Sequence, residues 1–219
     1  MSAREKTFDR LARPYRLLEW IAFGSLLERA RFKHLDRLRD RRRILLLGDG
    51  DGRVLARVCA LAPDARIDSL DLSGGMLARA ALRLSPTDRA RVRFRHDDAL
   101  RADYPPAAYD AVTTFFFLDC FTDAQADLLI NRLQPALTPD AVWLFADFSE
   151  PSRGLMRLRA KAWLGVMYLF FRWQTGLASH RLPDSENLLR KSGFARLAET
   201  SFQHGFVRST VFAKPPADR

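Results

Sequence analysis

The sequence predicts an α/β domain built around a mostly parallel β-sheet whose last two strands form an antiparallel hairpin. From residue 44 onward, short apolar runs alternate with longer segments of helical pattern, which is the arrangement of successive βαβ units. Two strand-like runs at residues 195–202 and 206–214 are separated only by Gln203, His204 and Gly205, a spacing that favours a hairpin. The composition agrees, since 47% of the 219 residues are hydrophobic, which is enough to form one folded core.

The charge and the cysteines exclude several classes of protein. The formal net charge of +10 comes almost entirely from arginines spread along the whole chain, so we interpret it as solvated surface and expect no nucleic-acid partner. The longest uncharged apolar run, residues 162–171, is about half the length of a membrane-spanning helix, and the first twenty residues lack the apolar segment of a secretory signal. Cys59 and Cys120 show neither disulfide nor zinc-ligand spacing, so we predict a cytoplasmic protein without a metal site.

The elements follow in order along the chain. Residues 7–38 predict two helices, broken at Pro14 and near Gly24, so we assign residues 1–40 to an N-terminal helical cover and residues 41–219 to the core. Core strands are predicted at residues 44–47, 66–72, 92–95, 110–117 and 141–148, and the helices between them at residues 53–62, 75–84 and 123–137. An inserted helix is predicted at residues 153–173, basic at its start and apolar on every side from residue 162. A short helix is predicted at residues 185–191, before the hairpin.

The sharpest local motif is Ile44-Leu45-Leu46-Leu47-Gly48-Asp49-Gly50-Asp51-Gly52, a buried strand that runs into three glycines and then a helix. Glycines in this place let a ligand approach the backbone closely at the start of a helix. The spacing is not the G-x-G-x-x-G of a dinucleotide site, because Arg53 stands where the third glycine belongs, and no Gly-Lys-Ser/Thr of a P-loop follows. The alternative is a plain tight turn.

Two acids follow at strand ends. Asp71 closes the second strand 19 residues after Gly52, about where the ribose-binding acid of a nucleoside site falls in a βαβ fold. The alternative is that Asp71, followed by Ser73, only caps the next helix. Asp98, in His96-Asp97-Asp98-Ala99 just past the third strand, is placed to accept a hydrogen bond from the exocyclic amine of adenine.

These motifs resemble those of the class I S-adenosylmethionine-dependent methyltransferases, particularly the small-molecule methyltransferases that include enzymes of quinone biosynthesis. The resemblance covers most of the chain. It rests on the glycine motif and on Ser69-Leu70-Asp71-Leu72-Ser73, Met76-Leu77, Asp98-Ala99, Tyr109-Asp110-Ala111-Val112, Gly193-Phe194, and Phe8-Asp9 with Tyr15. It implies a Rossmann-like sheet of seven strands with helices on both faces, to which N-terminal and inserted cover helices are added.

The resemblance also implies S-adenosylmethionine as cofactor, bound by Gly48, Asp49, Gly50, Gly52, Asp71, Leu72, Met76, Asp98, Ala99 and Phe115. One departure of the chain from the family pattern matters for the cofactor. Members usually have an acid two residues before the first glycine, where this chain has Leu46. Either Asp49 or Asp51 replaces that acid electrostatically, or the site has lost cofactor affinity, and the sequence leaves both alternatives open.

For the acceptor, the resemblance implies a small, apolar or aromatic molecule, quinone-like or lipid-like. Methyl transfer from a sulfonium is an in-line displacement in which the protein positions the nucleophile and excludes water, so no fixed catalytic triad is expected. Candidates for an assisting acid or base, by topology alone, are Asp119, Cys120, Asp147, His180 and His204. Candidate substrate-binding residues are Tyr15, Phe117, Trp163 and Tyr168, and Phe115 or Phe117 is expected to border the methyl-transfer chamber.

The inserted helix and the function each have alternatives. With residues 7–38, residues 153–173 are interpreted as a lid over a lipophilic acceptor, as a peripheral contact with a membrane surface, or as a buried packing or homodimer helix. The rival function is a non-catalytic binding or assembly protein on the same fold, which Leu46 and the lack of an evident base favour. A nucleic-acid methyltransferase is disfavoured because the chain has neither an Asn/Asp-Pro-Pro-Tyr/Phe nor a Pro-Cys motif.

Overall fold

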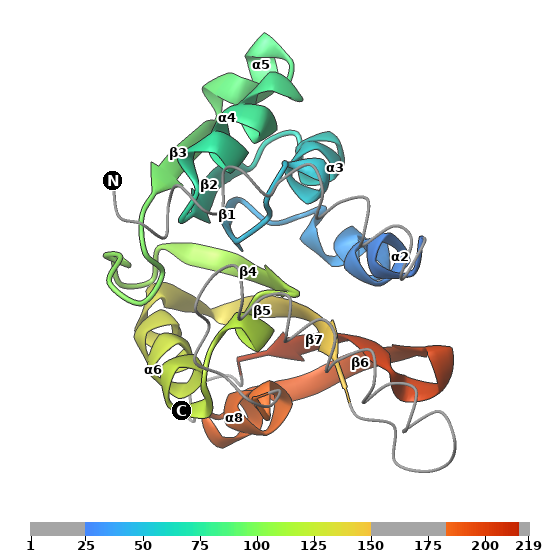
Figure 1. Cartoon of the computed structure of the whole chain (residues 1–219). Helices are drawn as coiled ribbons and strands as arrows, with labels where there is room; N and C mark the ends of the chain where they lie inside the picture. Colours follow the sequence, from blue (N-terminus) through green and yellow to red (C-terminus); the bar gives the residue numbers. More distant parts are fainter. Residues whose placement is uncertain (1–24, 150–182, 215–219) are drawn as a thin grey trace.

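The computed structural model describes residues 25–149 and 183–214, and within them the expected α/β sheet is confirmed (Figure 1). Seven strands lie in the order β3-β2-β1-β4-β5-β7-β6, with β7 antiparallel to both of its neighbours. The strands are β1 (Arg43–Leu47), β2 (Arg66–Asp71), β3 (Val92–His96), β4 (Tyr109–Phe115), β5 (Leu137–Phe148), β6 (Ala195–Phe202) and β7 (Val207–Ala213).

The strand order places a topological switch point at the centre of the sheet. The chain runs outward from β1 through β2 to β3, and then returns to pair β4 with the other side of β1, in parallel. In open α/β sheets the ligand crevice forms outside the carboxyl ends of the strands at such a point. The residues that follow β1, β2, β4 and β5 are therefore the ones to inspect for a site.

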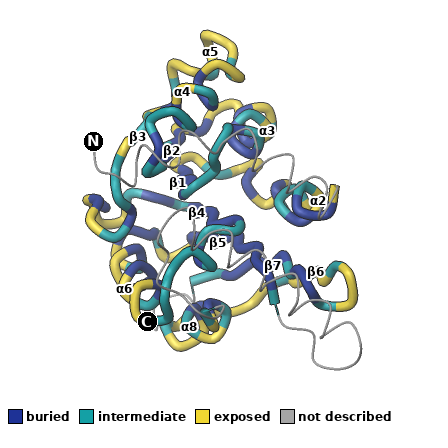
Figure 2. The backbone as a smooth tube through the Cα atoms, in the orientation of Figure 1, coloured by how far each residue is buried: buried dark blue, intermediate teal, exposed yellow. Residues whose placement is uncertain are grey.

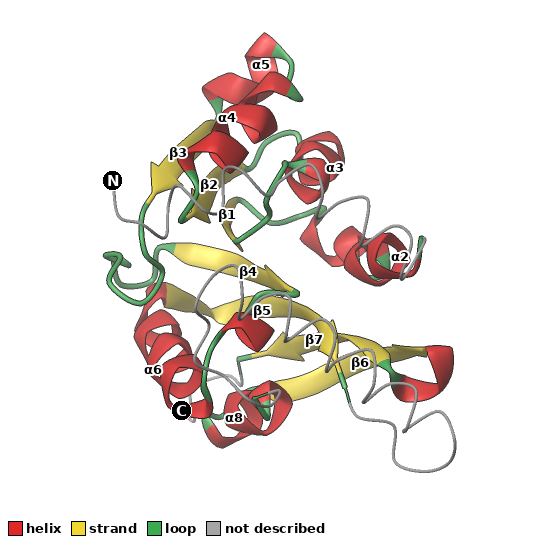
Figure 3. Ribbon diagram, in the orientation of Figure 1, coloured by secondary structure: helices red, strands yellow, loops and turns green. Residues whose placement is uncertain are grey.

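Alternating residues of the central strands supply two cores. Ile44 and Leu46 of β1 face one core, and Leu45 and Leu47 face the other, so the strand is buried on both faces (Figure 2). Helices α3 (Arg53–Leu61) and α4 (Gly74–Leu82) contribute to the first core, and α6 (Asp123–Leu133) and α8 (Ser185–Lys191) cover the second (Figure 3). Helices on both faces are the arrangement that a mostly parallel sheet requires.

The structure corrects the predicted end of the fourth strand. The apolar run predicts a strand that reaches residue 117, but β4 ends at Phe115. The N–H of Phe116 still donates to the carbonyl of Ala146 in β5 at 2.7 Å, and its φ of +51° then turns the chain away. A left-handed residue turns the chain out of the strand direction. The two residues after β4 therefore leave the sheet at its carboxyl edge.

The boundaries around Pro135 and Pro86 also differ from the prediction. The helix expected at residues 123–137 ends at Leu133, because Pro135 occupies a separate 3₁₀ turn, Gln134–Ala136, and β5 already begins at Leu137. The sequence interpretation missed α5 (Pro86–Ala90), although its signal is present: Ser85 accepts the N–H of Asp88, and Pro86 takes the first helical position.

The described part of the N-terminal segment packs on the sheet. Helix α2 (Leu26–Phe32) contacts β6 and β7, and Leu26, Leu27, Leu35 and Leu38 lie in the same core as Ile44 of β1. Residues 1–24 and the helix predicted at residues 153–173 lie outside the described residues, so the predicted cover stays a prediction. Among the described helices, none combines the length and the apolar character that a membrane crossing needs.

Candidate functional site

The glycine loop between β1 and α3 adopts a conformation that suits glycine throughout. Gly48, Gly50 and Gly52 have φ angles of +64°, +68° and +84°. A Cβ atom on Gly52 would lie 2.5 Å from the Cα of Ala80 in α4, so this glycine lets two helices approach. A Cβ atom on Gly50 would meet no atom within 4 Å. Close packing therefore explains Gly52, whereas Gly50 turns toward open space at the carboxyl edge.

Asp71 connects the end of β2 to this loop. Its Oδ2 accepts the N–H of Gly50 at 3.2 Å, and its Oδ1 accepts the N–H of Ser73 at 2.9 Å. The cap of α4 is Ser73 itself, whose Oγ accepts the N–H of Met76 at 3.1 Å. The alternative role predicted for Asp71, capping of the next helix, is thus performed by Ser73. The Asp71 carboxylate lies against the glycine loop.

The two acids of the glycine loop have different surroundings. Leu46 is fully buried in the core. Oδ2 of Asp49 accepts the N–H of Leu55 at 2.9 Å at the start of α3, and burial raises the pKa of Asp49 to about 7. The Asp51 carboxylate pairs instead with Arg83, with Nη2 and Oδ2 2.8 Å apart.

The predicted adenine-side residues lie on the loop after β3. Asp98 holds that loop, because its Oδ1 accepts the N–H of Leu100 at 3.0 Å, and Ala99 is buried. The carbonyl of Leu72 lies 3.0 Å from Nε2 of His96, the last residue of β3, which pairs in register with Asp71. The ends of β2 and β3 are therefore held together beside the glycine loop.

The three phenylalanines at the end of β4, Phe115 to Phe117, occupy three different environments. Phe115 is only 8% exposed and belongs to the core, so of the two candidates for the chamber wall it is Phe117 that reaches the loop. A Cβ atom on Gly48 would lie 2.2 Å from Cδ2 of Phe117, and the Phe117 ring meets Phe121 edge-on at 5.2 Å. Phe116 packs on Phe148, and the Arg31 guanidinium carbon lies 5.1 Å from its ring centre.

A pair of buried carboxyl groups lies at the ends of β4 and β5. Asp119, in the 3₁₀ turn Leu118–Cys120, is hydrogen-bonded to Asp147 of β5, so one of the two groups carries the proton. Burial is the main cause that raises the pKa of both groups, and for Asp147 the charge of Asp119 adds to it. The Cys120 thiol lies 3.5 Å from Oδ1 of Asp119, and Oδ1 of Asp147 accepts the N–H of Phe148 at 2.9 Å.

The remaining candidates are less informative. His204 is exposed in the turn between β6 and β7, with a φ of +57°. Tyr15, Trp163, Tyr168 and His180 lie outside the described residues. The sequence interpretation missed Arg31 of α2. Burial raises the pKa of Asp49 and of Asp119, and the positive charge of Arg31 partly offsets that rise. No motif separates this arginine from the many others.

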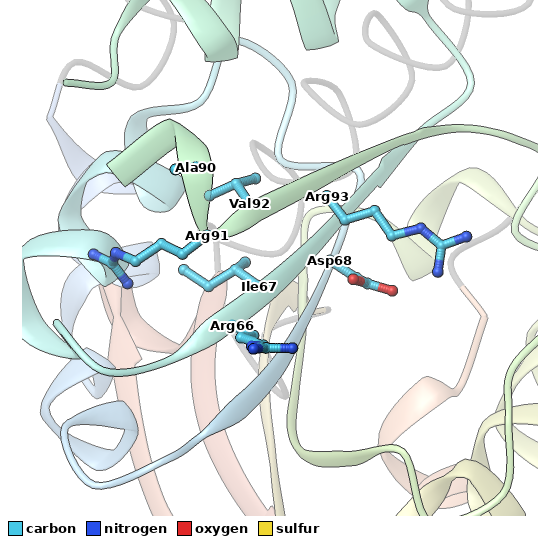
Figure 4. A pocket seen from close by; sticks show the side chains of 7 residues that line it. All are labelled: Arg66, Ile67, Asp68, Ala90, Arg91, Val92 and Arg93. Atoms are coloured by element: carbon cyan, nitrogen blue, oxygen red, sulfur yellow. The ribbon is translucent and has the colours of Figure 1, made fainter. Parts of the chain in front are cut away.

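Two cavities lie at opposite edges of the sheet. The larger, about 570 Å³, lies at the amino ends of β2 and β3, where Asp68 and Arg93 project to one side and Arg91 to the other (Figure 4). The smaller, about 330 Å³, lies at the carboxyl end of β5 and includes Asp147 of the acid pair. Because ligands of open α/β sheets bind at the carboxyl edge, the smaller cavity belongs to the candidate site.

Comparisons with known proteins agree with this geometry. Residues 44–140 match the family described as "Methyltransferase domain". Demethylmenaquinone methyltransferase of Thermus thermophilus is 32% identical over 153 residues, which are 69% of this chain and 68% of the relative.

Solved structures share the fold. An O-methyltransferase family protein of Burkholderia thailandensis superposes with a TM-score of 0.69 and 19% identity, over 99% of this chain but only 60% of that protein. The 1,6-didemethyltoxoflavin-N1-methyltransferase of the same organism, solved with S-adenosylhomocysteine bound, gives a TM-score of 0.67 with 18% identity over 96% of this chain and 87% of that one. The chain therefore belongs to the class I S-adenosylmethionine-dependent methyltransferases, enzymes whose cofactor is S-adenosylmethionine.

Proposed function

We propose that this chain transfers a methyl group from S-adenosylmethionine to a small, apolar or aromatic acceptor that carries a hydroxyl group, of the quinol type. The observation that carries the proposal is the juxtaposition at the carboxyl edge. The glycine loop with Asp71 lies beside the ends of β4 and β5, where Phe117 offers an apolar wall and Asp119 and Asp147 offer carboxyl groups.

The relatives support a small acceptor. The Thermus thermophilus relative is named for demethylmenaquinone, and the Burkholderia thailandensis structure holds 1,6-didemethyltoxoflavin. One name refers to a quinone, and the other to a small molecule bound in the solved structure. A lipid-like acceptor is the alternative within the same class.

The residues predicted to bind the cofactor suit an adenosyl ligand. Gly50 turns toward open space beside the Asp71 carboxylate, and a carboxylate at this place accepts ribose hydroxyls in charge-assisted hydrogen bonds. The backbone at Gly48 and Gly50 lets a ligand come close, and Asp98 follows β3 where the adenine would lie. When bound, S-adenosylmethionine supplies an electrophilic methyl group on a sulfonium.

The chain's own residues have three tasks in this transfer. Phe117 and its neighbours exclude water, and the loop after β4 positions the acceptor. Asp119 receives the proton of the acceptor's hydroxyl group, which makes the oxygen, or the ring carbon conjugated with it, more nucleophilic.

Contact with a membrane surface through residues 153–173 and formation of a homodimer stay predictions, because these residues lie outside the described part of the chain.

Titration calorimetry tests the proposal first. We expect S-adenosylmethionine and S-adenosylhomocysteine to bind, and radiolabelled methyl transfer to follow with a panel of hydroxylated bicyclic aromatics. The rival, a non-catalytic binding protein, predicts cofactor binding with no labelled product from any acceptor. Failure to bind either cofactor form would overturn the proposed function at its first step.

A further inference from the structure

We propose that the cavity at the carboxyl end of β5 binds the oxygen-bearing part of the acceptor, with Ser185 and Arg208 as hydrogen-bond donors and the Asp119–Asp147 pair as the proton acceptor. The inference deepens the proposed function and rests on it. It assigns a binding subsite to residues of β7 and α8, which the sequence motifs do not include.

The walls of this cavity suit a small ring compound. Its volume of about 330 Å³ is at the lower end of the size range of ligand pockets. Phe145 and Phe148 of β5 and Pro183 supply apolar surface. Asp147, Ser185 and Arg208 bring polar groups from three elements into the same cavity, which is the mixture that fixes the orientation of a small ligand.

Two of these polar groups have no partner among the described residues. Ser185 is only 3% exposed, and its Oγ makes no hydrogen bond. Nε of Arg208 is likewise buried without an acceptor. A buried donor without a partner is costly, and native structures retain such groups mainly where a water, an ion or a ligand satisfies them. Both lie on this cavity, so both point to a ligand that offers an oxygen acceptor.

The strand register explains why Arg208 is available. Arg208 of β7 stands directly opposite Asp147 of β5, on the same face of the sheet. Its Nη1 nevertheless turns to Glu186 of α8, at 3.1 Å from Oε2. Glu186 thereby fixes the guanidinium, while Nε is left without an acceptor, and Arg208 and Asp147 both line the cavity.

The acid pair completes the subsite. With one proton between Asp119 and Asp147, the pair can take one more. The O–H bond of the acceptor breaks, its proton joins the pair, and the pair goes from one proton to two, which leaves the acceptor oxygen negatively charged. Ser185 Oγ–H and Arg208 Nε–H then donate to that oxygen or to a neighbouring carbonyl. Arg31 from α2 and the Cys120 thiol act on the pair, Asp71 acts on Cys120, and Glu186 from α8 lies beside Arg208.

Binding of two simple probes tests the subsite without turnover. 1-Naphthol and naphthalene differ only in the hydroxyl group, and titration calorimetry with saturating S-adenosylhomocysteine measures both. We expect the wild-type protein to prefer 1-naphthol by about tenfold, the value of one or two buried hydrogen bonds. Ser185→Ala and Arg208→Lys should each reduce this preference about threefold or more, because each removes one donor. The lysine substitution keeps the positive charge toward Glu186, so a loss of preference there reports the missing Nε–H and not a missing charge.

The controls separate this inference from the proposed function. Ser192→Ala, at the other end of α8 and outside the cavity, should leave the preference unchanged. Ser185→Ala should melt at the wild-type temperature, since it removes no internal hydrogen bond. Equal binding of both naphthalenes by the wild-type protein, or binding of neither, overturns the subsite even when S-adenosylhomocysteine binds. Absence of S-adenosylhomocysteine binding instead overturns the proposed function.

Discussion

Asp71 is the residue that couples the second strand to the glycine loop. Its carboxylate accepts N–H groups from Gly50 and from Ser73, so it holds the loop in shape as well as facing the proposed ribose position. We expect Asp71→Ala to weaken S-adenosylmethionine binding by about 1.5 to 3 kcal/mol, the value of lost charge-assisted hydrogen bonds. Calorimetry on the folded variant, checked by circular dichroism, measures this loss. An unchanged dissociation constant would remove Asp71 from the cofactor site.

Asp49 gives the molecule a pH dependence of stability that one substitution should remove. Its pKa is about 7 in the folded protein and 3.8 in an ordinary aspartate. Between these values the unfolded chain has lost the proton while the folded one keeps it, so the free energy of unfolding falls as the pH rises from about 4 to about 7. An asparagine side chain in its place would still accept the N–H of Leu55 but cannot ionise.

Asp49→Asn should therefore be more stable than the wild type at pH 8, by about 1 to 3 kcal/mol, and much closer to it at pH 4. The full difference in pKa corresponds to about 4 kcal/mol, and partial solvent access of Asp49 reduces it. Urea denaturation at the two pH values measures the effect. The exposed Asp64→Asn serves as the control and should change little at either pH. A gain of equal size at both pH values would show that the ionisation of Asp49 is not its source.

Individual site residues could be predicted only where a motif has a fixed spacing. Asp71 and Gly50 follow from the distance between a glycine loop and the next strand end. Arg31 and Arg208 could not be found in this way, because their roles depend on side chains from distant elements that meet only in the folded sheet. Asp147 was recognisable as an acid near a strand end, but its hydrogen bond to Asp119 depends on how the chain turns at Phe116.

The glycine loop is one element with two separable functions. At Gly52 a methyl group would lie 2.5 Å from the backbone of Ala80, whereas at Gly50 it would meet open space. We expect Gly52→Ala to lower the free energy of unfolding by about 2 to 5 kcal/mol, through backbone strain and overpacking together. Gly50→Ala should cost only about 1 to 2 kcal/mol of stability, from the positive φ alone, but should strongly weaken cofactor binding.

Denaturation and calorimetry on the two glycine variants distinguish these effects. If the folded Gly50→Ala variant binds S-adenosylhomocysteine like the wild type, the ligand does not approach the loop at this residue. If Gly52→Ala is as stable as the wild type, the close contact between α3 and α4 is not what requires this glycine.

Helices and strands were predicted well where the apolar residues are strongly periodic, and poorly where a single residue sets the end of the element. The seven strands and the final hairpin follow from apolar runs and their spacing, and the structure confirms them. The end of β4 depends on one left-handed residue, Phe116, which no propensity predicts. The five-residue helix α5 is too short to show a periodic pattern of apolar residues. Its N-terminus could still have been predicted from Ser85 as the N-cap and Pro86 at the first helical position.

The order of the strands in the sheet does not follow from the local sequence pattern. Alternating strands and helices predict a parallel sheet, but several strand orders satisfy that pattern equally. The packing of α2 on β6 and β7 could likewise not be predicted from the sequence. The apolar residues of α2 are compatible with a helix that covers the site and with a helix that belongs to the core. Only the long-range packing, which joins residues before 40 to the last strands, distinguishes a cover helix from a core helix.

That packing leads to a prediction for the molecule as a whole. Leu27 of α2 is 3% exposed and lies in one core with Ile44 of β1 and Val211 of β7. If α2 belongs to this cooperative unit, Leu27→Ala should lower the free energy of unfolding of the entire domain by about 2 to 5 kcal/mol, in a single transition seen alike by near- and far-ultraviolet circular dichroism. Leu128→Ala, at a leucine that is 49% exposed, is the matched control and should change stability by less than about 1 kcal/mol. A Leu27→Ala variant that keeps the main transition unchanged and adds a separate early one would instead make the segment before residue 40 an independent cover, able to open while the sheet stays folded.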